Sequence, residues 1–176
     1  MQKVRLYACG DGLWSGSGFG EQLRHILYGL AQTGEYEVIL QSLQHLGYPI
    51  DVPDTIFPDL PQKGATVKVV PTHGLPNEFG SYMFPKHYYK YSPDILLFLG
   101  DPRNVKTWID VVQDIPIFFV FMTTLDGLPI PPSWQQDYFD HVDMLLTMSE
   151  WALHEFQKAN MSIRGYIHHG IRTDFW

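Results

Sequence analysis

One stretch, VRLYACGDGLWSGSGFGEQL (residues 4–23), decides the fold. It opens with the apolar run Val4–Ala8, which predicts a strand, and it continues through a glycine-rich turn. Apolar residues then recur at helical spacing from Gly18 to Gln32, and Gly34 follows as a stop. A strand, a glycine-rich turn and a helix in this order are typical of the first unit of an α/β protein.

The rest of the chain repeats this alternation. Further apolar runs predict strands at Tyr36–Leu40, Ala65–Val70, Asp94–Leu99, Ile115–Phe121, Asp143–Met148 and Ile163–His168. Helical patterns cover Asn104–Val112, residues 133–139 and Glu150–Ala159. Residues 44–64 contain four prolines and predict an irregular excursion. Strands that are apolar throughout are typical of parallel sheets, so the sequence predicts a doubly wound, Rossmann-like parallel α/β sheet.

The length and composition suit a globular protein of one ordinary domain or two very small ones. The chain has 176 residues, of which 45% are hydrophobic and 18% are charged. Its net charge of −7, without a run of Lys or Arg, argues against a surface for nucleic acid. The single cysteine, Cys9, allows no internal disulfide and fits a reducing, cytoplasmic setting. The first residues lack the apolar core of a signal peptide and no stretch approaches membrane-spanning length, so neither feature is expected.

The glycine-rich turn is the best candidate for a ligand site. Ligands of open α/β sheets bind beyond the carboxyl ends of the strands, and this turn follows the first strand directly. Glycines let the backbone approach an anion closely, and the start of a helix offers free N–H groups and the positive end of its dipole. A phosphate-bearing ligand is therefore predicted; the alternative is a turn whose glycines only bend the chain.

The known nucleotide fingerprints do not fit this turn. Gly16 and Gly18 are followed by Glu21 where the dinucleotide pattern needs a third glycine. The Walker pattern is missing too, since no Gly-Lys-Ser or Gly-Lys-Thr occurs. The ligand is therefore expected to carry phosphate without being a classical dinucleotide.

Three segments, taken together, resemble one family. They are SGSGFGEQLR (15–24), DGLPIPPSW (126–134), and MSEW (148–151) with IHHGIRTDFW (167–176). They are similar to the glycine loop, the Asp-Gly-x-Pro-x-Pro-Pro-x-Trp stretch, and the Ser-x-Trp and closing segments of retaining, metal-independent glycosyltransferases. These are the GT-B enzymes of the glycogen-synthase and mannosyltransferase type (group 1, family 4).

The resemblance implies an architecture and an activity. Residues 1–170 would be the Rossmann-like, acceptor-side amino-terminal domain, and residues 171–176 would begin the crossover to a carboxy-terminal domain. That second domain, in the same chain or another, would hold the nucleotide, so the 176 residues alone would be inactive. The complete enzyme would move a sugar from a nucleotide-sugar donor to a carbohydrate or lipid-linked acceptor, without metal or other cofactor, in the cytoplasm or at the membrane periphery.

Candidate site residues follow from the loop and from strand ends. The backbone of Gly16, Ser17, Gly18 and Phe19 is the expected contact for the donor diphosphate. Trp14 is expected to line the cleft, and the resemblance adds His169 and Gly170 to that lining.

Two aspartates are candidates for hydrogen bonding to a sugar hydroxyl and for a catalytic role. Asp101 and Asp126 each follow a predicted middle strand. Asp101 has an alternative role as a helix cap, and Asp126 has one as a turn residue. Tyr88 and Tyr89 lie in an aromatic connection that either forms an acceptor wall or packs against the sheet edge.

Other functions stay open at the level of sequence. His168 and His169 lack a third ligand at a diagnostic spacing, so no metal site is expected. A non-catalytic Rossmann-like binding or interaction domain is one alternative, and an epimerase-like module is another. Against the epimerase, the dinucleotide fingerprint fails, and Tyr82 and Lys86, at the spacing of a Tyr-x-x-x-Lys pair, stand in a proline-broken stretch.

Overall fold

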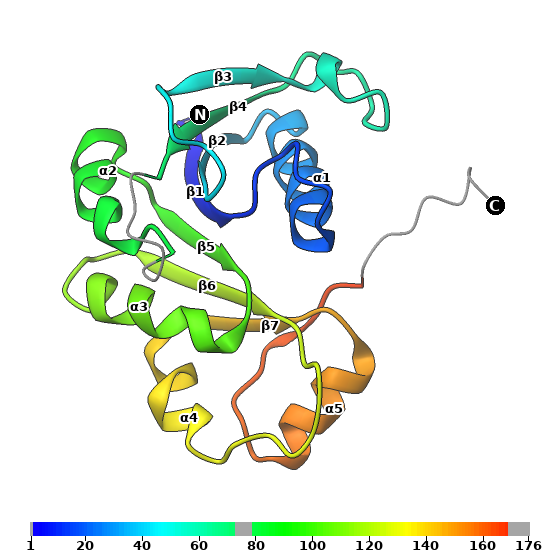
Figure 1. Ribbon diagram of the computed structural model, residues 1–176, viewed down its shortest axis with the longest axis vertical. Helices are drawn as coiled ribbons and strands as arrows, with labels where there is room; N and C mark the ends of the chain where they lie inside the picture. Colours follow the sequence, from blue (N-terminus) through cyan, green and yellow to red (C-terminus); the bar gives the residue numbers. More distant parts are fainter. Residues whose placement is uncertain (1, 73–78, 169–176) are drawn as a thin grey trace.

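The computed structural model describes residues 2–72 and 79–168 (Figure 1). The strands are β1 (Val4–Gly10), β2 (Tyr36–Ser42), β3 (Ile50–Pro53), β4 (Thr66–Pro71), β5 (Ile95–Leu99), β6 (Phe118–Thr123), β7 (Met144–Thr147) and β8 (Gly165–Tyr166). The α-helices are α1 (Gly18–Gln32), α2 (Phe84–Tyr91), α3 (Pro102–Val112), α4 (Trp134–Asp137) and α5 (Glu150–Lys158). Short 3₁₀ turns lie at Asp54–Ile56, Ser81–Met83 and Phe139–His141.

Within the described residues the strands form one sheet in the order β3-β4-β2-β1-β5-β6-β7-β8. All neighbouring pairs are parallel except β3 with β4. The predicted doubly wound, Rossmann-like α/β sheet is confirmed. Because β2 and β4 extend the sheet on one side of β1 and β5 to β8 on the other, the chain order reverses between β1 and β5. In open α/β sheets, ligands bind outside the carboxyl ends of the strands at such a point.

One prediction about the sheet is wrong. The proline-rich excursion 44–64 contains strand β3, which pairs antiparallel with β4 at the edge of the sheet. Its Val52 is buried and lies opposite Val67, while Pro53 ends the strand, where a missing N–H is tolerated. The carboxylate of Asp54 then accepts the N–H groups of Lys63 and Ala65, both at 3.0 Å, and closes the loop between the two strands.

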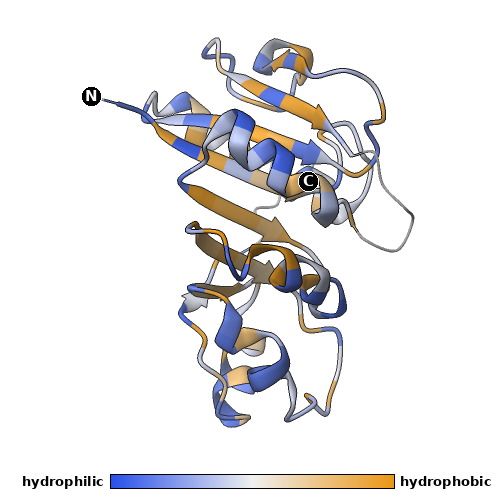
Figure 2. Ribbon diagram, turned by 90° about the vertical axis from the view of Figure 1, so that its left-hand side faces the viewer, coloured by the Kyte–Doolittle hydropathy of each residue, from blue (hydrophilic) through white to orange (hydrophobic). Residues whose placement is uncertain are grey.

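Apolar side chains fill both faces of the sheet, and Figure 2 shows the strands as the most apolar part of the ribbon. On one face, Leu23 and Leu27 of α1 join Leu6 and Ala8 of β1 in a buried cluster. The other face is covered by α2, α3 and α5, and Figure 1 shows α1 on the opposite side of the sheet from α2 and α3. Among the described residues, no helix has the length and apolar character needed to cross a membrane.

A buried polar network fixes α2 to the sheet. The hydroxyl of Tyr7 donates to Gln41 Oε1 and also contacts His87 Nδ1, each at 2.5 Å. Burial raises the pKa of Tyr7 above its ordinary value of 10, so the phenol stays protonated. The side-chain amide of Gln41 donates to Thr72 Oγ1 (2.8 Å) and to the carbonyl of Gly80 (2.7 Å). These contacts hold the segment before α2 against the ends of β2 and β4.

Candidate functional site

The loop between β1 and α1 is held in shape by its own side chains. Ser17 precedes the first residue of α1, and its Oγ accepts the N–H of Gly20 at 3.0 Å. The hydroxyl of Ser17 donates to the carboxylate of Asp11, and Ser15 Oγ accepts the N–H of Ser17 at 3.2 Å. The helix start is therefore capped in the way that serine caps usually are, and the loop is not a disordered bend.

The glycines of this loop divide into two kinds. Gly12 and Gly20 are buried, and a Cβ on Gly20 would lie 2.8 Å from Ser15 Cβ and 2.9 Å from the carbonyl oxygen of Gly12. Gly16 and Gly18 are exposed, and a Cβ on either would have no heavy atom within 4 Å. Neither has a positive φ. Packing therefore explains the inner glycines, whereas nothing in the described part of the fold requires glycine at 16 and 18.

The outer glycines also present free donors. Within the described residues, the N–H groups of Gly16, Gly18 and Phe19 have no acceptor, while those of Gly20 and Glu21 are bound by Ser17. Unbound N–H groups at a helix start, together with the helix dipole, are suited to an anion. This surface lies beyond the carboxyl end of β1, beside β5, where the chain order of the sheet reverses.

Two further helices begin at the same edge. Since α3 follows β5 and α5 follows β7, their starts lie at the carboxyl ends of parallel strands, as the start of α1 does. Ser149 Oγ caps α5 by accepting the N–H of Ala152 at 3.1 Å. Three helix dipoles thus place their positive ends along one edge of the sheet, which favours a negatively charged ligand there.

The structure places Asp101 as the cap of α3. Asp101 Oδ1 accepts the backbone N–H of Arg103 (2.9 Å) and its Nε–H (3.0 Å), while Oδ2 accepts Nη2–H (2.8 Å). The hydrogen bonds from the Arg103 side chain lower the pKa of Asp101 below its ordinary value of 3.8. The carboxylate is therefore ionised, and both of its oxygens already accept hydrogen bonds from Arg103. Asp101 thus has the helix-capping role that was the alternative to a catalytic one.

Asp126 lies at the same edge of the sheet and, unlike Asp101, does not cap a helix. It is exposed, in the connection after β6. The pKa of Arg103 is raised, first by its hydrogen bonds and charge interaction with Asp101 and in smaller part by the charge of Asp126. Asp101, Arg103 and Asp126 thus lie at the same edge of the sheet, near the ends of β5 and β6. Arg103 was not foreseen from the sequence, although its position two residues after a capping aspartate is a usable signal.

Trp14 and two unforeseen residues form one side of the loop. The Trp14 ring is 45% exposed and meets the ring of His45 edge-on, with 5.9 Å between centroids. Gln44 Oε1 accepts the N–H of Gly12 at 2.5 Å, and Gln44 Nε2 donates to Asp11 Oδ1 at 2.9 Å. The segment after β2 therefore fixes the base of the glycine loop, and the exposed indole stands beside it.

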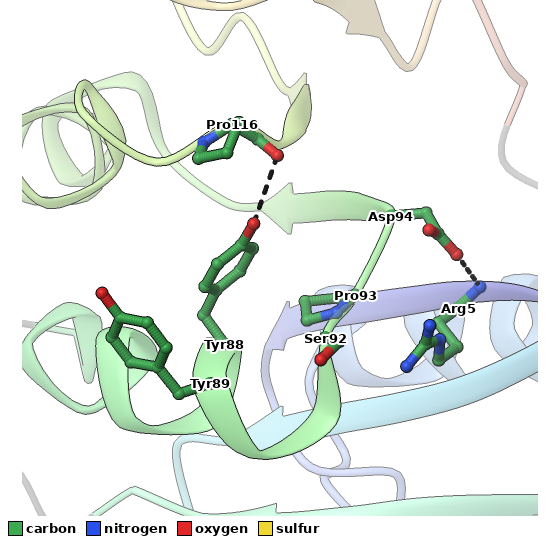
Figure 3. Close-up of a pocket in the computed structure, with 7 residues that line it drawn as sticks. All are labelled: Arg5, Tyr88, Tyr89, Ser92, Pro93, Asp94 and Pro116. Atoms are coloured by element: carbon green, nitrogen blue, oxygen red, sulfur yellow. Dashed lines mark hydrogen bonds between the residues drawn. The ribbon is translucent and has the colours of Figure 1, made fainter.

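Tyr88 and Tyr89 do not join this group. They lie in the last turn of α2, which leads into the amino end of β5, and they line a shallow cavity of about 410 Å³ with residues that precede or begin strands (Figure 3). The structure therefore separates them from the glycine loop by the length of the strands. His169 and Gly170 lie outside the described residues; His168, at the end of the described chain, is exposed beside the Tyr166 ring.

No set of three or more His, Cys, Asp or Glu side chains in the part of the chain that the structure describes is arranged to hold a metal ion. The site therefore consists, as far as it is described, of backbone donors, helix starts, two aspartates with an arginine, and an exposed indole. These groups can bind an anion and hydrogen-bond to a polar ligand.

Comparison with known proteins identifies the fold. No protein-family model matches the chain, and no curated protein matches its sequence. A sucrose-phosphate synthase structure from Thermosynechococcus elongatus superposes with a TM-score of 0.54 at 9% identity, over 99% of this chain and 91% of that one. The UDP-GlcNAc 2-epimerase of Methanocaldococcus jannaschii gives a TM-score of 0.52 at 14% identity, over 96% of this chain.

The fold is GT-B-like. The chain spans only 45% of the length of the epimerase. At these identities the likeness concerns the arrangement of strands and helices alone.

Proposed function

We propose that this chain is the acceptor-side amino-terminal domain of a glycosyltransferase that uses a nucleotide-sugar donor and retains the configuration of the sugar. The observation that carries the proposal is the pair of open glycines, Gly16 and Gly18, whose region offers unbound N–H groups at the start of α1. The donor diphosphate would lie on this surface. The GT-B-like fold and the sucrose-phosphate synthase likeness support the same class of reaction.

The reaction needs little more than placement and charge stabilisation from this domain. As the bond between sugar and diphosphate breaks, negative charge grows on the departing oxygen. Fixed N–H donors and a helix dipole stabilise that charge without reorganising, because they are already oriented. The hydroxyl of Ser17 is bound to Asp11, so the backbone, and not this side chain, would contact the phosphate.

The two aspartates take different parts in this proposal. Asp101 holds the start of α3 and orients Arg103. Asp126, which is exposed at the same edge, would accept a hydrogen bond from a sugar hydroxyl, and Trp14 would line the cleft beside the loop. His169 and Gly170 would complete the lining, and residues 171–176 would lead to a carboxy-terminal domain that grips the nucleotide. Without that domain the chain would bind a donor weakly and would not transfer sugar.

A second candidate, nucleotide-sugar epimerisation, is favoured by the likeness to UDP-GlcNAc 2-epimerase over 96% of this chain. Both candidates act on a nucleotide-sugar. They differ in the product: a glycosyltransferase lengthens an acceptor, whereas an epimerase returns the nucleotide-sugar with one inverted centre. An assay of the complete protein with a UDP-sugar, with and without oligosaccharide acceptors, separates the two.

The diphosphate site itself can be tested on the 176-residue chain. In a ¹⁵N NMR titration with UDP, UDP-glucose or pyrophosphate, the amide signals of Gly16, Gly18 and Phe19 are expected to shift most. Gly18→Val should weaken pyrophosphate binding by about tenfold or more, because a side chain would stand between the anion and the amides. Gly29→Val is the matched control, since Gly29 is also an exposed glycine of α1 with no atom within 4 Å of a Cβ. Equal effects of the two substitutions, or tight binding of NAD at the loop, would contradict the proposal.

A further inference from the structure

The amino-terminal edge of the sheet carries a second candidate binding site, the cavity of about 410 Å³ beside α2 (Figure 3). It is bounded by the last turn of α2, the first residues of β1, and the residues just before β5 and β6. All of these lie at the opposite ends of the strands from the glycine loop. A ligand here would leave the loop free, so the inference does not depend on the proposed function.

Two tyrosine rings, with Pro93 and Pro116, form the apolar part of the cavity. Tyr88 Oη donates to the carbonyl of Pro116 at 3.4 Å, and its ring packs against Phe84. Tyr89 is 83% exposed, and its ring stands nearly perpendicular to that of Tyr88, at 76° with 5.9 Å between centroids. Figure 3 shows both rings projecting from the same turn of α2. A half-buried ring, packed against the core, and an exposed ring thus stand side by side at the cavity.

The polar part of the cavity consists of an arginine and an aspartate. Arg5 Nη1 donates to the carbonyl of Tyr91 at 3.0 Å, and the backbone N–H of Arg5 donates to Asp94 Oδ2 at 2.7 Å. Within the described residues, Asp94 Oδ1 and the remaining guanidinium N–H groups of Arg5 have no partner. The lining therefore offers fixed donors and a fixed acceptor side by side, and its one positive and one negative formal charge cancel.

This combination selects a class of ligand. Flat aromatic faces bind the C–H faces of sugar rings, while neighbouring hydroxyl groups need a donor and an acceptor at close range. An anionic ligand such as a diphosphate would meet the carboxylate of Asp94. A proline-rich peptide would fit the rings, but it has few donors for Asp94 Oδ1. We propose that this cavity binds a neutral oligosaccharide and holds a carbohydrate chain away from the glycine loop.

The test is a titration of the 176-residue chain, ¹³C-labelled in its tyrosine rings and ¹⁵N-labelled in its backbone, with maltohexaose and with cellohexaose. We expect saturable shifts of the Tyr88 and Tyr89 rings and of the Asp94 amide with at least one of the two sugars. Pyrophosphate is expected to leave these signals unchanged. Shifts at Gly16 and Gly18 report the proposed function separately, so failure of one site is distinguishable from failure of the other.

Substitutions make the test specific. Tyr89→Ala should weaken oligosaccharide binding by about tenfold, because it removes the open ring face. Tyr48→Ala is the matched control: Tyr48 is 87% exposed, between β2 and β3, and its loss should leave the affinity unchanged. The proposal is overturned if neither sugar gives saturable shifts at Tyr88 and Tyr89, if Tyr48→Ala weakens binding as much as Tyr89→Ala, or if only a proline-rich peptide or pyrophosphate shifts the cavity signals.

Discussion

Where the strands of this sheet end, α1, α3 and α5 begin; where β5 begins, α2 ends. In a parallel sheet, helix starts, with their free N–H groups, therefore gather at one edge. Helix ends, with their free carbonyl groups, gather at the other edge. The carboxyl edge holds the open amides of the glycine loop, and Asp101 supplies a negative charge at the start of α3. The amino edge holds helix carbonyls, and Arg5 donates to one of them at Tyr91. Each edge thus has its own chemistry, set by the direction of the chain.

The largest expected effect separates the two kinds of glycine at the carboxyl edge. Gly20→Val should lower the free energy of unfolding by about 2–3 kcal/mol, because its side chain would press on Ser15 and on the Gly12 carbonyl. Gly18→Val should change it by less than about 0.5 kcal/mol, since its side chain would meet nothing. Urea denaturation followed by circular dichroism measures both. Equal losses would mean that the open glycines also serve the fold.

A second prediction concerns the charge at the start of α3. Asp101→Ala should lower the free energy of unfolding at neutral pH by about 1 kcal/mol, the usual loss on removing a helix cap. Arg103 lowers the pKa of Asp101 below 3.8, so the ionised side chain stabilises the folded state above that pH. That stabilisation is lost as the pH falls through the lower folded pKa, and the difference between the variant and the natural chain should shrink there.

Asp110, in the last turn of the same helix, is the control for this prediction. Its side chain is 63% exposed and lies 3.8 Å from Lys106 Nζ, an exposed ion pair that contributes little, while a negative charge near a helix carboxyl end is unfavourable. Asp110→Ala should therefore leave stability unchanged or raise it slightly at neutral pH. If thermal unfolding showed the same loss for both variants, the position of the charge along the helix would not matter, and the contrast between the two edges would fail.

A smaller effect is expected at Asp11, whose carboxylate lies in the glycine loop beside the proposed anion site. It accepts hydrogen bonds from the Ser17 hydroxyl and from Gln44 Nε2. Asp11→Asn keeps the shape but removes a charge that repels a diphosphate, so pyrophosphate should bind about threefold more tightly, equivalent to about 0.6 kcal/mol. Asp51→Asn, on β3 and 62% exposed, is the control. Unchanged or weaker binding in the NMR titration would place the anion elsewhere.

Much of the fold follows from local sequence pattern, because strands buried on both faces and the spacing within α1 leave clear signals. The helix predicted from Gly18 to Gln32 has those bounds in the structure. Strand β3 left no such signal, because only Val52 of its four residues faces the core and prolines surround it. Strand β6 begins at Phe118, three residues after its predicted start, because Ile115 closes a turn on Val112.

The site was less accessible to sequence reasoning. The glycine loop could be located because its position depends on neighbouring elements alone. The contact of Gln44 with Gly12 joins residues 32 positions apart and depends on the pairing of β1 with β2. Residues shortly before a strand lie at its amino end, so the position of Tyr88 and Tyr89 ahead of β5 already separates them from the glycine loop.

The smallest effect is expected at the amino edge, from Tyr88→Phe. The hydrogen bond from Tyr88 Oη to Pro116 is 3.4 Å long, near the outer limit for a hydroxyl donor, and Pro116 is exposed, so water can replace the lost donor. The free energy of unfolding should change by less than about 0.5 kcal/mol, in contrast to the loss from Gly20→Val. Denaturation in urea measures the change, and a loss above 1 kcal/mol would contradict it. Such a loss would mean that the Tyr88 hydroxyl, and not only its partly buried ring, helps to hold this edge together.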